Sequence, residues 1–216
     1  MSIHSPMTIT LDHIRPHPLP DVPSAVWGRQ TTIESGAGYL VTAPSGKGKS
    51  TLLHIMYGLR TDYDGVLEFD GRPALSMDPD QWADIRSHRL AVVYQDLRLF
   101  GHLTARQNIE IKRQLAPRID ASRAVEMATQ LGIAGVLDQA ASTLSYGQRQ
   151  RVAIIRALCQ PFEMLLLDEP FSHLDADNIG LAKDLIREAC EDQGAGYVLV
   201  SLGPDYGFSF NHHLTL

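Results

Sequence analysis

The stretch Tyr39-Leu40-Val41-Thr42-Ala43-Pro44-Ser45-Gly46-Lys47-Gly48-Lys49-Ser50-Thr51 decides the fold of this chain. Its first four residues predict a short strand, and residues 50–58 predict a helix, with a glycine-rich turn between the two. Gly46 and Gly48 lack a Cβ atom, so backbone N–H groups in such a turn can converge on an anion. The positive end of the following helix points at the same place. This order of elements predicts a loop that binds phosphate.

The loop resembles the Walker A motif, G-x-x-x-x-G-K-[ST], of P-loop nucleoside triphosphatases. The resemblance implies that Lys49 contacts the outer phosphates and that the Ser50 hydroxyl binds Mg²⁺. Ala43 replaces the first glycine, which would strain the loop by about 1 kcal/mol if that position required positive φ. The alternative is an ordinary turn rich in glycine and serine. The residues expected to hold ATP here are Ala43, Pro44, Ser45, Gly46, Lys47, Gly48, Lys49, Ser50 and Thr51.

Two carboxylates follow an entirely apolar run, since Met164 to Leu167 lead directly into Asp168-Glu169-Pro170. Such a run is typical of a strand buried on both faces of a parallel sheet, and ligands bind at the carboxyl ends of these strands. The segment resembles the Walker B motif. The resemblance implies that Asp168 holds Mg²⁺ and that Glu169 acts as the general base on the attacking water. A strand that runs into an acidic surface turn is the alternative.

The segment Leu144-Ser145-Tyr146-Gly147-Gln148 resembles the LSGGQ signature of ABC ATPases, with Tyr146 at its third position. A serine and a glycine at the start of a helix form an anion site from a hydroxyl, backbone N–H groups and the helix dipole. The resemblance implies that Ser145, Gly147 and Gln148 bind the γ-phosphate held by a second subunit, so that ATP is hydrolysed at a dimer interface. Ser145 can also be a plain N-cap of the next helix.

Other segments match the same family in the same order. Gln95 follows the apolar run 90–94 as the glutamine of the Q-loop does, and residues 172–175 resemble the D-loop. The resemblance covers about residues 36–201. It implies that Gln95 acts in catalysis beside Glu169 and reaches Mg²⁺, so the expected metal ligands are Ser50, Gln95 and Asp168. Leu97, Leu99 and Phe100 either line a groove that receives a permease helix or belong to the core.

Strands that alternate with helices predict an α/β fold. The expected strands are 7–14, 39–42, 66–69, 90–94, 164–167 and 197–201, and the expected helices include 149–159 and 176–193. Residues 96–143 lack strand signals, and 121–131 have helical spacing with Val125, Ala128 and Leu131 on one stripe. The resemblance implies a P-loop NTPase core with a mostly parallel sheet, an N-terminal antiparallel β subdomain and an inserted α-helical subdomain. We expect one domain over 1–216, with a core of about 1–95 and 144–216 and a helical subdomain of about 96–143.

The chain departs from the family pattern at two further places. Leu202 stands where the family has a switch histidine, and His212 and His213 lie on the terminal segment instead. Losing one donor to developing charge can cost on the order of 10²–10³ in rate. The proline-rich loop 16–23 offers no tyrosine or phenylalanine to stack on adenine, which leaves His17 and Trp27 as candidates. We therefore expect a slow ATPase.

Composition narrows the class of protein. The 216 residues carry a net charge of −6, which gives no electrostatic basis for broad nucleic-acid binding. No apolar run approaches the roughly 18 residues that a membrane helix needs, and residues 1–20 do not resemble a signal peptide. Cys159 and Cys190 have no metal-ligand spacing and fit ordinary thiols in a reducing compartment. The expected location is the cytoplasm, peripheral on the cytoplasmic face of a membrane.

These expectations describe the ATP-binding and ATP-hydrolysing subunit of an ABC transporter, with ATP and Mg²⁺ as cofactors. Its expected partners are a second copy or a closely related ATPase subunit, and a separate transmembrane permease. Length favours subunits of lipoprotein-release, macrolide-efflux or cell-division permeases over importers with a C-terminal regulatory domain. One alternative is a slow-turnover regulator of a membrane complex of the cell-division type. The other is a non-transport ABC ATPase, which usually has a coiled-coil insertion or tandem cassettes.

Overall fold

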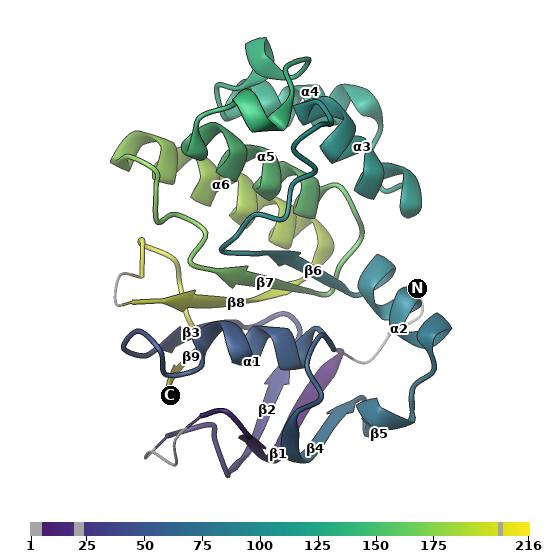
Figure 1. Cartoon of the computed structure of the whole chain (residues 1–216), viewed down its shortest axis with the longest axis vertical. Coiled ribbons are helices and arrows are strands. Elements are labelled where there is room, and N and C mark those ends of the chain that lie inside the picture. Colours follow the sequence, from purple (N-terminus) through teal and green to yellow (C-terminus); the bar gives the residue numbers. More distant parts are fainter. Residues whose placement is uncertain (1–5, 20–23, 203–204) are drawn as a thin grey trace.

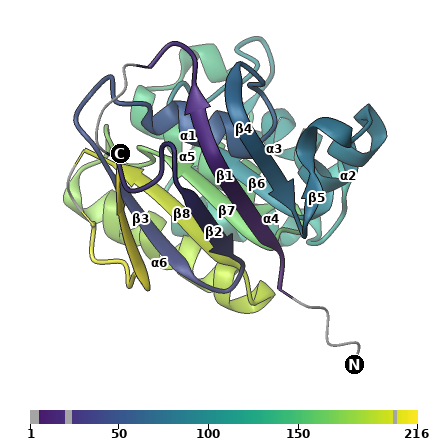
Figure 2. The same ribbon diagram turned by 90° about the horizontal axis from the view of Figure 1, so that it is seen from below.

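An antiparallel sheet forms the N-terminal part of the computed structural model, which describes residues 6–19, 24–202 and 205–216. Its strands are β1 (Thr8–Pro16), β2 (Gln30–Glu34), β4 (Tyr63–Phe69) and β5 (Arg72–Pro73), in the order β2-β1-β4-β5 (Figure 2). Alternate residues of β1, such as Ile9 and Leu11, are fully buried, as expected when one face of a sheet packs on a core. The expected antiparallel β subdomain is confirmed.

A parallel sheet of five strands forms the centre of the molecule. It contains β6 (Leu90–Val93), β7 (Met164–Asp168), β8 (Gly196–Ser201), β3 (Gly38–Thr42) and β9 (His212–Thr215), in the order β6-β7-β8-β3-β9. Every pair in this sheet is parallel, which confirms the α/β fold with a mostly parallel sheet. β9 was not predicted as a strand. It pairs Tyr39 with His212, and the two rings stack with centroids 4.7 Å apart.

Helices cover both faces of the parallel sheet. α1 (Lys49–Met56) lies between the two sheets, whereas α5 (Tyr146–Leu158) and α6 (Ala176–Gln193) cover the opposite face (Figure 1). β7 serves both layers, because Met164 and Leu166 belong to the hydrophobic core around α1 while Leu165 and Leu167 belong to the core under α5 and α6. This is why the strand is apolar at every position. α2 (Pro79–His88) precedes β6.

The region between β6 and α5 is helical, as expected. It contains α3 (Ala105–Leu115) and α4 (Ala121–Gln130), with short 3₁₀ turns at Ala134–Val136 and Ala141–Thr143; another 3₁₀ turn, Ala74–Ser76, precedes α2. The predicted stripe of α4 is wrong at Val125, which is 37% exposed, whereas Ala124, Ala128 and Leu131 are buried. Val125 and Leu131 lie about 120° apart around the helix axis, so they cannot share one buried face.

Two further observations concern the helices and the cysteines. In the described part of the chain, no helix is both long and apolar enough to cross a bilayer. Cys159 and Cys190 are free and buried, and burial raises the pKa of each thiol to about 12. The thiols therefore stay protonated near neutral pH and behave as small apolar side chains.

Candidate active site

The phosphate loop occupies residues 43–48, between the end of β3 and the start of α1. Gly46 and Gly48 have φ values of +78° and +93°, a region that only glycine adopts at little cost. A Cβ atom on Gly48 would lie 2.4 Å from Leu19 Cδ1 and 3.2 Å from Trp27 Cζ2. Position 48 therefore requires glycine for its conformation and for the space around it. Ala43 does not have a positive φ, so the strain considered for that position is absent.

Lys49 follows this loop as the first residue of α1 and is only 6% exposed. Its Nζ donates to the carbonyl oxygens of Ala43 at 2.9 Å and of Pro44 at 3.3 Å. The same Nζ lies 3.6 Å from Glu169 Oε1, which joins the loop to the end of β7. The ammonium group is thus held where an outer phosphate, cradled by the loop, would meet it.

Asp168 ends β7 and is 2% exposed. Burial raises the pKa of its carboxyl group, and a hydrogen bond with Ser50 opposes the rise. Its Oδ1 atom is buried and has no hydrogen-bond partner in the described part of the chain. A carboxylate oxygen without a partner, next to a serine hydroxyl that is hydrogen-bonded to the same carboxylate, provides the oxygen ligands that Mg²⁺ prefers. Ser50 and Asp168 therefore fit the metal.

The carboxylate of Glu169 is contacted at both oxygens. Oε1 faces Lys49, and Oε2 accepts a hydrogen bond from Gln95 Nε2 at 3.5 Å. The backbone of Glu169 has φ of +46°, an uncommon conformation for a residue with a side chain, and its N–H donates to Val200 O at 3.1 Å. Strain of this kind gathers at functional sites, where it aims a side chain. Gln95 thus meets the expected base, and its role as a metal ligand stays a prediction.

Ser145 caps the N-terminus of α5. Its Oγ accepts from Gln148 N at 3.2 Å, and Gln148 Oε1 accepts from Ser145 N at 2.9 Å, a reciprocal capping box. The helix therefore begins at Tyr146 instead of the predicted residue 149. Gly147 packs against the D-loop, because a Cβ atom there would lie 3.3 Å from His173 O. In the single chain Ser145 is an N-cap, and its contact with a second subunit's nucleotide stays a prediction.

Tyr146 joins three motifs within one chain. Its hydroxyl donates to Gln95 O at 2.8 Å, and its ring centroid lies 4.1 Å from that of His173 in the D-loop. The Arg149 guanidinium lies 5.2 Å from the same ring. Sequence reasoning marked Tyr146 only as a departure from the family pattern. An aromatic residue at a glycine position was the one signal that could have suggested a contact role.

The structure places the remaining predicted residues in different environments, some exposed and some buried. Leu202 is 59% exposed directly after β8, whose register with β3 pairs Thr42 with Ser201 and so places Leu202 beside the phosphate loop. Leu97 is 3% exposed and Leu99 packs against the core, so these two are core residues. Phe100 is 50% exposed and remains available to a partner.

Of the two adenine candidates, only Trp27 lies at the phosphate loop. His17 instead lies 3.3 Å from Asp64 through its Nε2 atom. The Trp27 ring packs beside Gly48, and its Nε1 atom is buried without a hydrogen-bond partner in the described ranges. The rest of the proline-rich loop, residues 20–23, lies outside the described residues.

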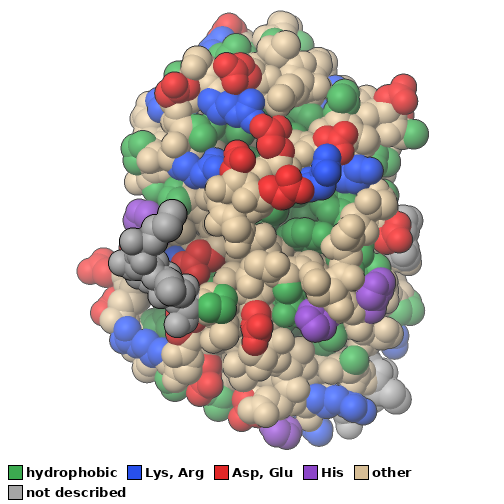
Figure 3. Space-filling view, turned by 180° about the vertical axis from the view of Figure 1, so that it is seen from behind, with side chains coloured by type: hydrophobic (Ala, Val, Ile, Leu, Met, Phe, Trp, Pro, Cys, Tyr) green, Lys and Arg blue, Asp and Glu red, His purple; other side chains and the backbone are tan. Residues whose placement is uncertain are grey.

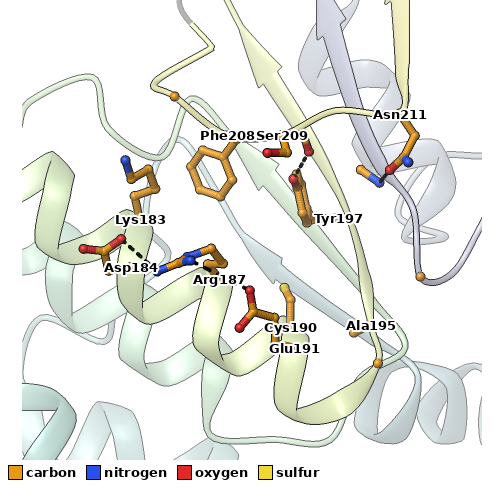
Figure 4. Close-up of a pocket in the computed structure, with 14 residues that line it drawn as sticks. Lys183, Asp184, Arg187, Cys190, Glu191, Ala195, Tyr197, Phe208, Ser209 and Asn211 are labelled. Atoms are coloured by element: carbon orange, nitrogen blue, oxygen red, sulfur yellow. Dashed lines mark hydrogen bonds and ion pairs between the residues drawn. The ribbon is translucent and has the colours of Figure 1, made fainter.

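A cavity of about 700 Å³ lies between α6 and the segment 205–211, at the opposite end of the parallel sheet (Figure 4). Tyr197 and Phe208 form one wall, and charged side chains of α6 form the other. Arg187 lies 3.5 Å from Asp184 and 4.0 Å from Glu191, so these charges are paired. Gly38 and Gly194 place the cavity at the amino ends of β3 and β8, away from the phosphate loop.

The phosphate loop, the buried Asp168 and the doubly contacted Glu169 lie at the carboxyl ends of parallel strands. This arrangement defines a P-loop nucleoside triphosphatase. Comparison with known proteins gives the family. The family profile described as ABC transporter matches residues 28–172. The thiamine import ATP-binding protein ThiQ of Escherichia coli (strain K12) is 35% identical over 173 residues, which cover 79% of this chain and 72% of that protein. ThiQ of Shigella flexneri serotype 5b (strain 8401) gives the same identity and coverage.

Two solved structures agree with this. The dimeric structure of MJ0796, a bacterial ABC transporter cassette, has a TM-score of 0.82 and 26% identity, and covers 96% of this chain and 94% of that one. A post-hydrolysis state of MJ0796 bound to ADP and Pi has a TM-score of 0.78 and 26% identity, and covers 90% of this chain and 88% of that one. The chain belongs to the ABC transporter family, as an ATP-binding subunit with ATPase activity that uses ATP and Mg²⁺.

Proposed function

We propose that two copies of this chain hydrolyse Mg²⁺-bound ATP at a shared interface and that the cycle drives a separate transmembrane permease. The position of Glu169 carries this proposal, since its carboxylate lies between Lys49 of the phosphate loop and Gln95. Glu169 polarises the attacking water, while Lys49 stabilises charge on the outer phosphates. Asp168 and Ser50 hold Mg²⁺, with Gln95 as a further ligand.

The proposed dimer supplies the residues that one chain lacks. Ser145, Gly147 and Gln148 of one copy contact the γ-phosphate in the phosphate loop of the other. Support comes from the capped N-terminus of α5, where backbone N–H groups and the helix dipole favour an anion. The dimeric cassette structure similar to this chain supports pairing of two copies.

The permease is proposed to be an importer on whose cytoplasmic face the chain sits. The relatives named above are import ATP-binding proteins, whereas chain length and general resemblance suggested lipoprotein-release, macrolide-efflux or cell-division subunits. The proposed division of labour follows the expected boundaries, with catalysis in about 1–95 and 144–216 and permease contact in about 96–143. Half-exposed Phe100, directly after the Q-loop, supports that contact.

Steady-state ATP hydrolysis by the purified chain tests the proposal. Glu169→Gln should abolish Mg²⁺-dependent turnover, because the amide cannot accept a proton from water. Glu163→Gln is the matched control, since Glu163 directly precedes β7, at its amino end, and pairs with Arg89. Equal loss of turnover in both variants would show that stability, and not the base, was affected.

A binding-driven regulator is the second candidate, favoured by the exposed Leu202 in place of a hydrogen-bonding side chain. Its distinguishing result is ATP-dependent dimerisation of the wild-type chain without measurable turnover. Turnover that Glu169→Gln abolishes would exclude it.

A further inference from the structure

The cavity of about 700 Å³ at the amino ends of β3 and β8 lies away from the phosphate loop, and no step of the proposed hydrolysis uses it. Its volume falls within the roughly 300–1,000 Å³ that is usual for sites that bind small molecules. One wall is helix α6, and the other is the segment 205–211 (Figure 4). This space is called the α6 cavity below.

The charged side chains that line the α6 cavity leave one cation without a carboxylate. Arg187 lies 3.5 Å from Asp184 and 4.0 Å from Glu191, so both acids are held by the same guanidinium (Figure 4). Lys183, one turn earlier on α6, is half-buried and has no carboxylate oxygen within 4.0 Å in the described ranges. Its Nζ atom would lie 3.5 Å from a Cβ atom on Gly207, so the ammonium group reaches across to the opposite wall.

Other cations beside α6 are paired. Arg123 of α4 lies 2.6 Å from Glu188 of α6, and Arg118 lies 3.9 Å from Asp192 of the same helix. In the upper half of Figure 3, Lys and Arg side chains lie next to Asp and Glu side chains. Lys183 differs from these neighbours because its charge faces a cavity, where partial exclusion of water strengthens its attraction for an anion.

Phe208 gives the opposite wall an aromatic surface. Its ring is half-buried, and its N–H donates to Asp205 O at 3.1 Å within a short turn. The far end of this segment is fixed, because Asn211 N donates to Gly38 O and Asn211 Oδ1 accepts from Gly38 N, both at 2.8 Å. A ring face of this kind favours stacking of a second flat ring.

We propose that the α6 cavity binds a small molecule that joins a flat aromatic ring to an acidic group, and that its binding fixes the D-loop. The acidic group contacts Lys183 Nζ, and the ring packs on Phe208. The two acids of the cavity do not select a cation, because Arg187 already occupies both. The inference goes beyond the proposed function, since the phosphate loop lies at the opposite end of the sheet.

The connection to the D-loop runs through packed rings. Phe208 stacks on Phe171 with ring centroids 5.9 Å apart, and Tyr206 meets Phe171 edge-on at 4.9 Å. Phe171 is 1% exposed and lies two residues after Glu169 and two before His173. Close-packed side chains cannot shift independently, so a ligand that holds Phe208 also holds the start of the D-loop.

Fluorescence titration of the full chain tests the binding site. The probes are anilinonaphthalene sulfonate, which carries an acidic group, and phenylnaphthylamine, which has the same rings without it; MgADP is present to fill the phosphate loop. Lys183→Gln should weaken binding of the sulfonate about fivefold and leave the neutral dye within about twofold. Phe208→Ala should weaken both dyes. Arg106→Gln, which removes a cation of α3 that is paired with Asp138, should change neither.

Hydrogen exchange tests the connection to the D-loop. Ser172 N donates to Glu169 O at 3.4 Å and Leu174 N donates to Phe171 O at 3.1 Å, so these N–H groups report opening of the D-loop. The bound sulfonate should slow their exchange at least about threefold. Phe171→Leu should still bind the dye but lose the slowing. Phe69→Leu, at a buried ring of β4, is the matched control and should keep both effects.

Other outcomes overturn the inference. Absence of dye binding, equal weakening of the two dyes by Lys183→Gln, or equal effects of Lys183→Gln and Arg106→Gln would show that the cavity does not select an aromatic anion. Unchanged exchange of the D-loop with the dye bound would contradict the connection through Phe171. None of these measurements uses hydrolysis. ATP turnover without dye binding therefore contradicts this inference alone, and dye binding with a slowed D-loop but no turnover contradicts the proposed function alone.

Discussion

At the scale of single residues, we expect Leu202 to limit the rate of hydrolysis. It is exposed at the end of β8, beside the phosphate loop, and it cannot donate a hydrogen bond to a γ-phosphate. Leu202→His should raise kcat by about 10-fold or more, because one preorganised donor to developing charge is worth on the order of 10²–10³. Leu181→His, at an exposed leucine of α6, is the control. Unchanged kcat in the Leu202 variant would mean that the position does not reach the nucleotide.

The pKa of Lys112 predicts that the free energy of unfolding depends on pH. Its folded-state pKa of about 8 lies below the ordinary lysine value of 10.5, so the folded chain loses this proton first. The loss of stability caused by the buried positive charge is complete below pH 8, and it disappears as the pH rises from about 8 toward the ordinary lysine pKa. Burial opposes protonation most, and the charges of Arg156 on α5 and Arg86 on α2 add to it.

Lys112→Met should therefore unfold at higher denaturant than the wild type at pH 7, and the gain should shrink between pH 8 and pH 9.5. Urea titrations at these pH values provide the measurement. Lys112→Arg keeps the charge and should show no gain. A gain for methionine that does not change with pH would assign the effect to packing.

At the scale of elements, α3 and α5 both begin with a capping box made by a hydroxyl residue and a glutamine, but only the cap of α5 is predicted to contact a nucleotide. Ser145 and Gln148 cap α5, and Thr104 and Gln107 cap α3. Ser145→Ala and Thr104→Ala should each cost about 1 kcal/mol of stability, because each leaves one backbone N–H without its acceptor. Only Ser145→Ala should also reduce ATP hydrolysis, by at least 10-fold. Similar ATPase losses in both variants would mean that Ser145 is an N-cap alone.

Tyr146 connects the same helix to the Q-loop through one hydrogen bond to Gln95 O. Tyr146→Phe keeps the ring on His173 and removes only the hydroxyl, so kcat should fall about 2- to 10-fold while KM for ATP changes little. Tyr197→Phe is the matched control, since it removes a hydroxyl that donates a hydrogen bond to Ser209 O outside the site. A fall in KM and kcat together, or a fall in both variants, would argue against positioning through Gln95.

At the scale of the whole molecule, the acidic surface should oppose pairing of two copies. Each chain carries a net charge of −6, so two chains repel one another at low ionic strength. For Glu169→Gln with ATP, we expect a dimer in sedimentation experiments that is stronger at about 150 mM than at about 10 mM salt. Its melting temperature should rise with protein concentration. A dimer of equal strength without ATP would contradict nucleotide-dependent pairing.

The sequence by itself determined the features that depend on neighbouring residues. Gly46 and Gly48, the apolar run that ends in Asp168, and the serine at the start of α5 each specify a local backbone shape, and all three shapes are present. The α/β alternation follows from the same local signals. Helical spacing gave a wrong prediction at Val125 of α4, because spacing alone does not show which of two adjacent faces of the helix packs on the core.

Only the tertiary structure decided which distant segments meet. Lys49 and Glu169 are 120 positions apart, and the Tyr146 hydroxyl reaches a carbonyl 51 positions away. β9 became a strand because β3 offered it a free edge, and its own residues gave no strand signal. Arg86, Lys112 and Arg156 act on one another from three separate helices, so no spacing along the chain predicts their proximity. Backbone geometry is encoded in short windows, whereas these contacts depend on how sheets and helices pack, which is fixed only when the whole chain folds.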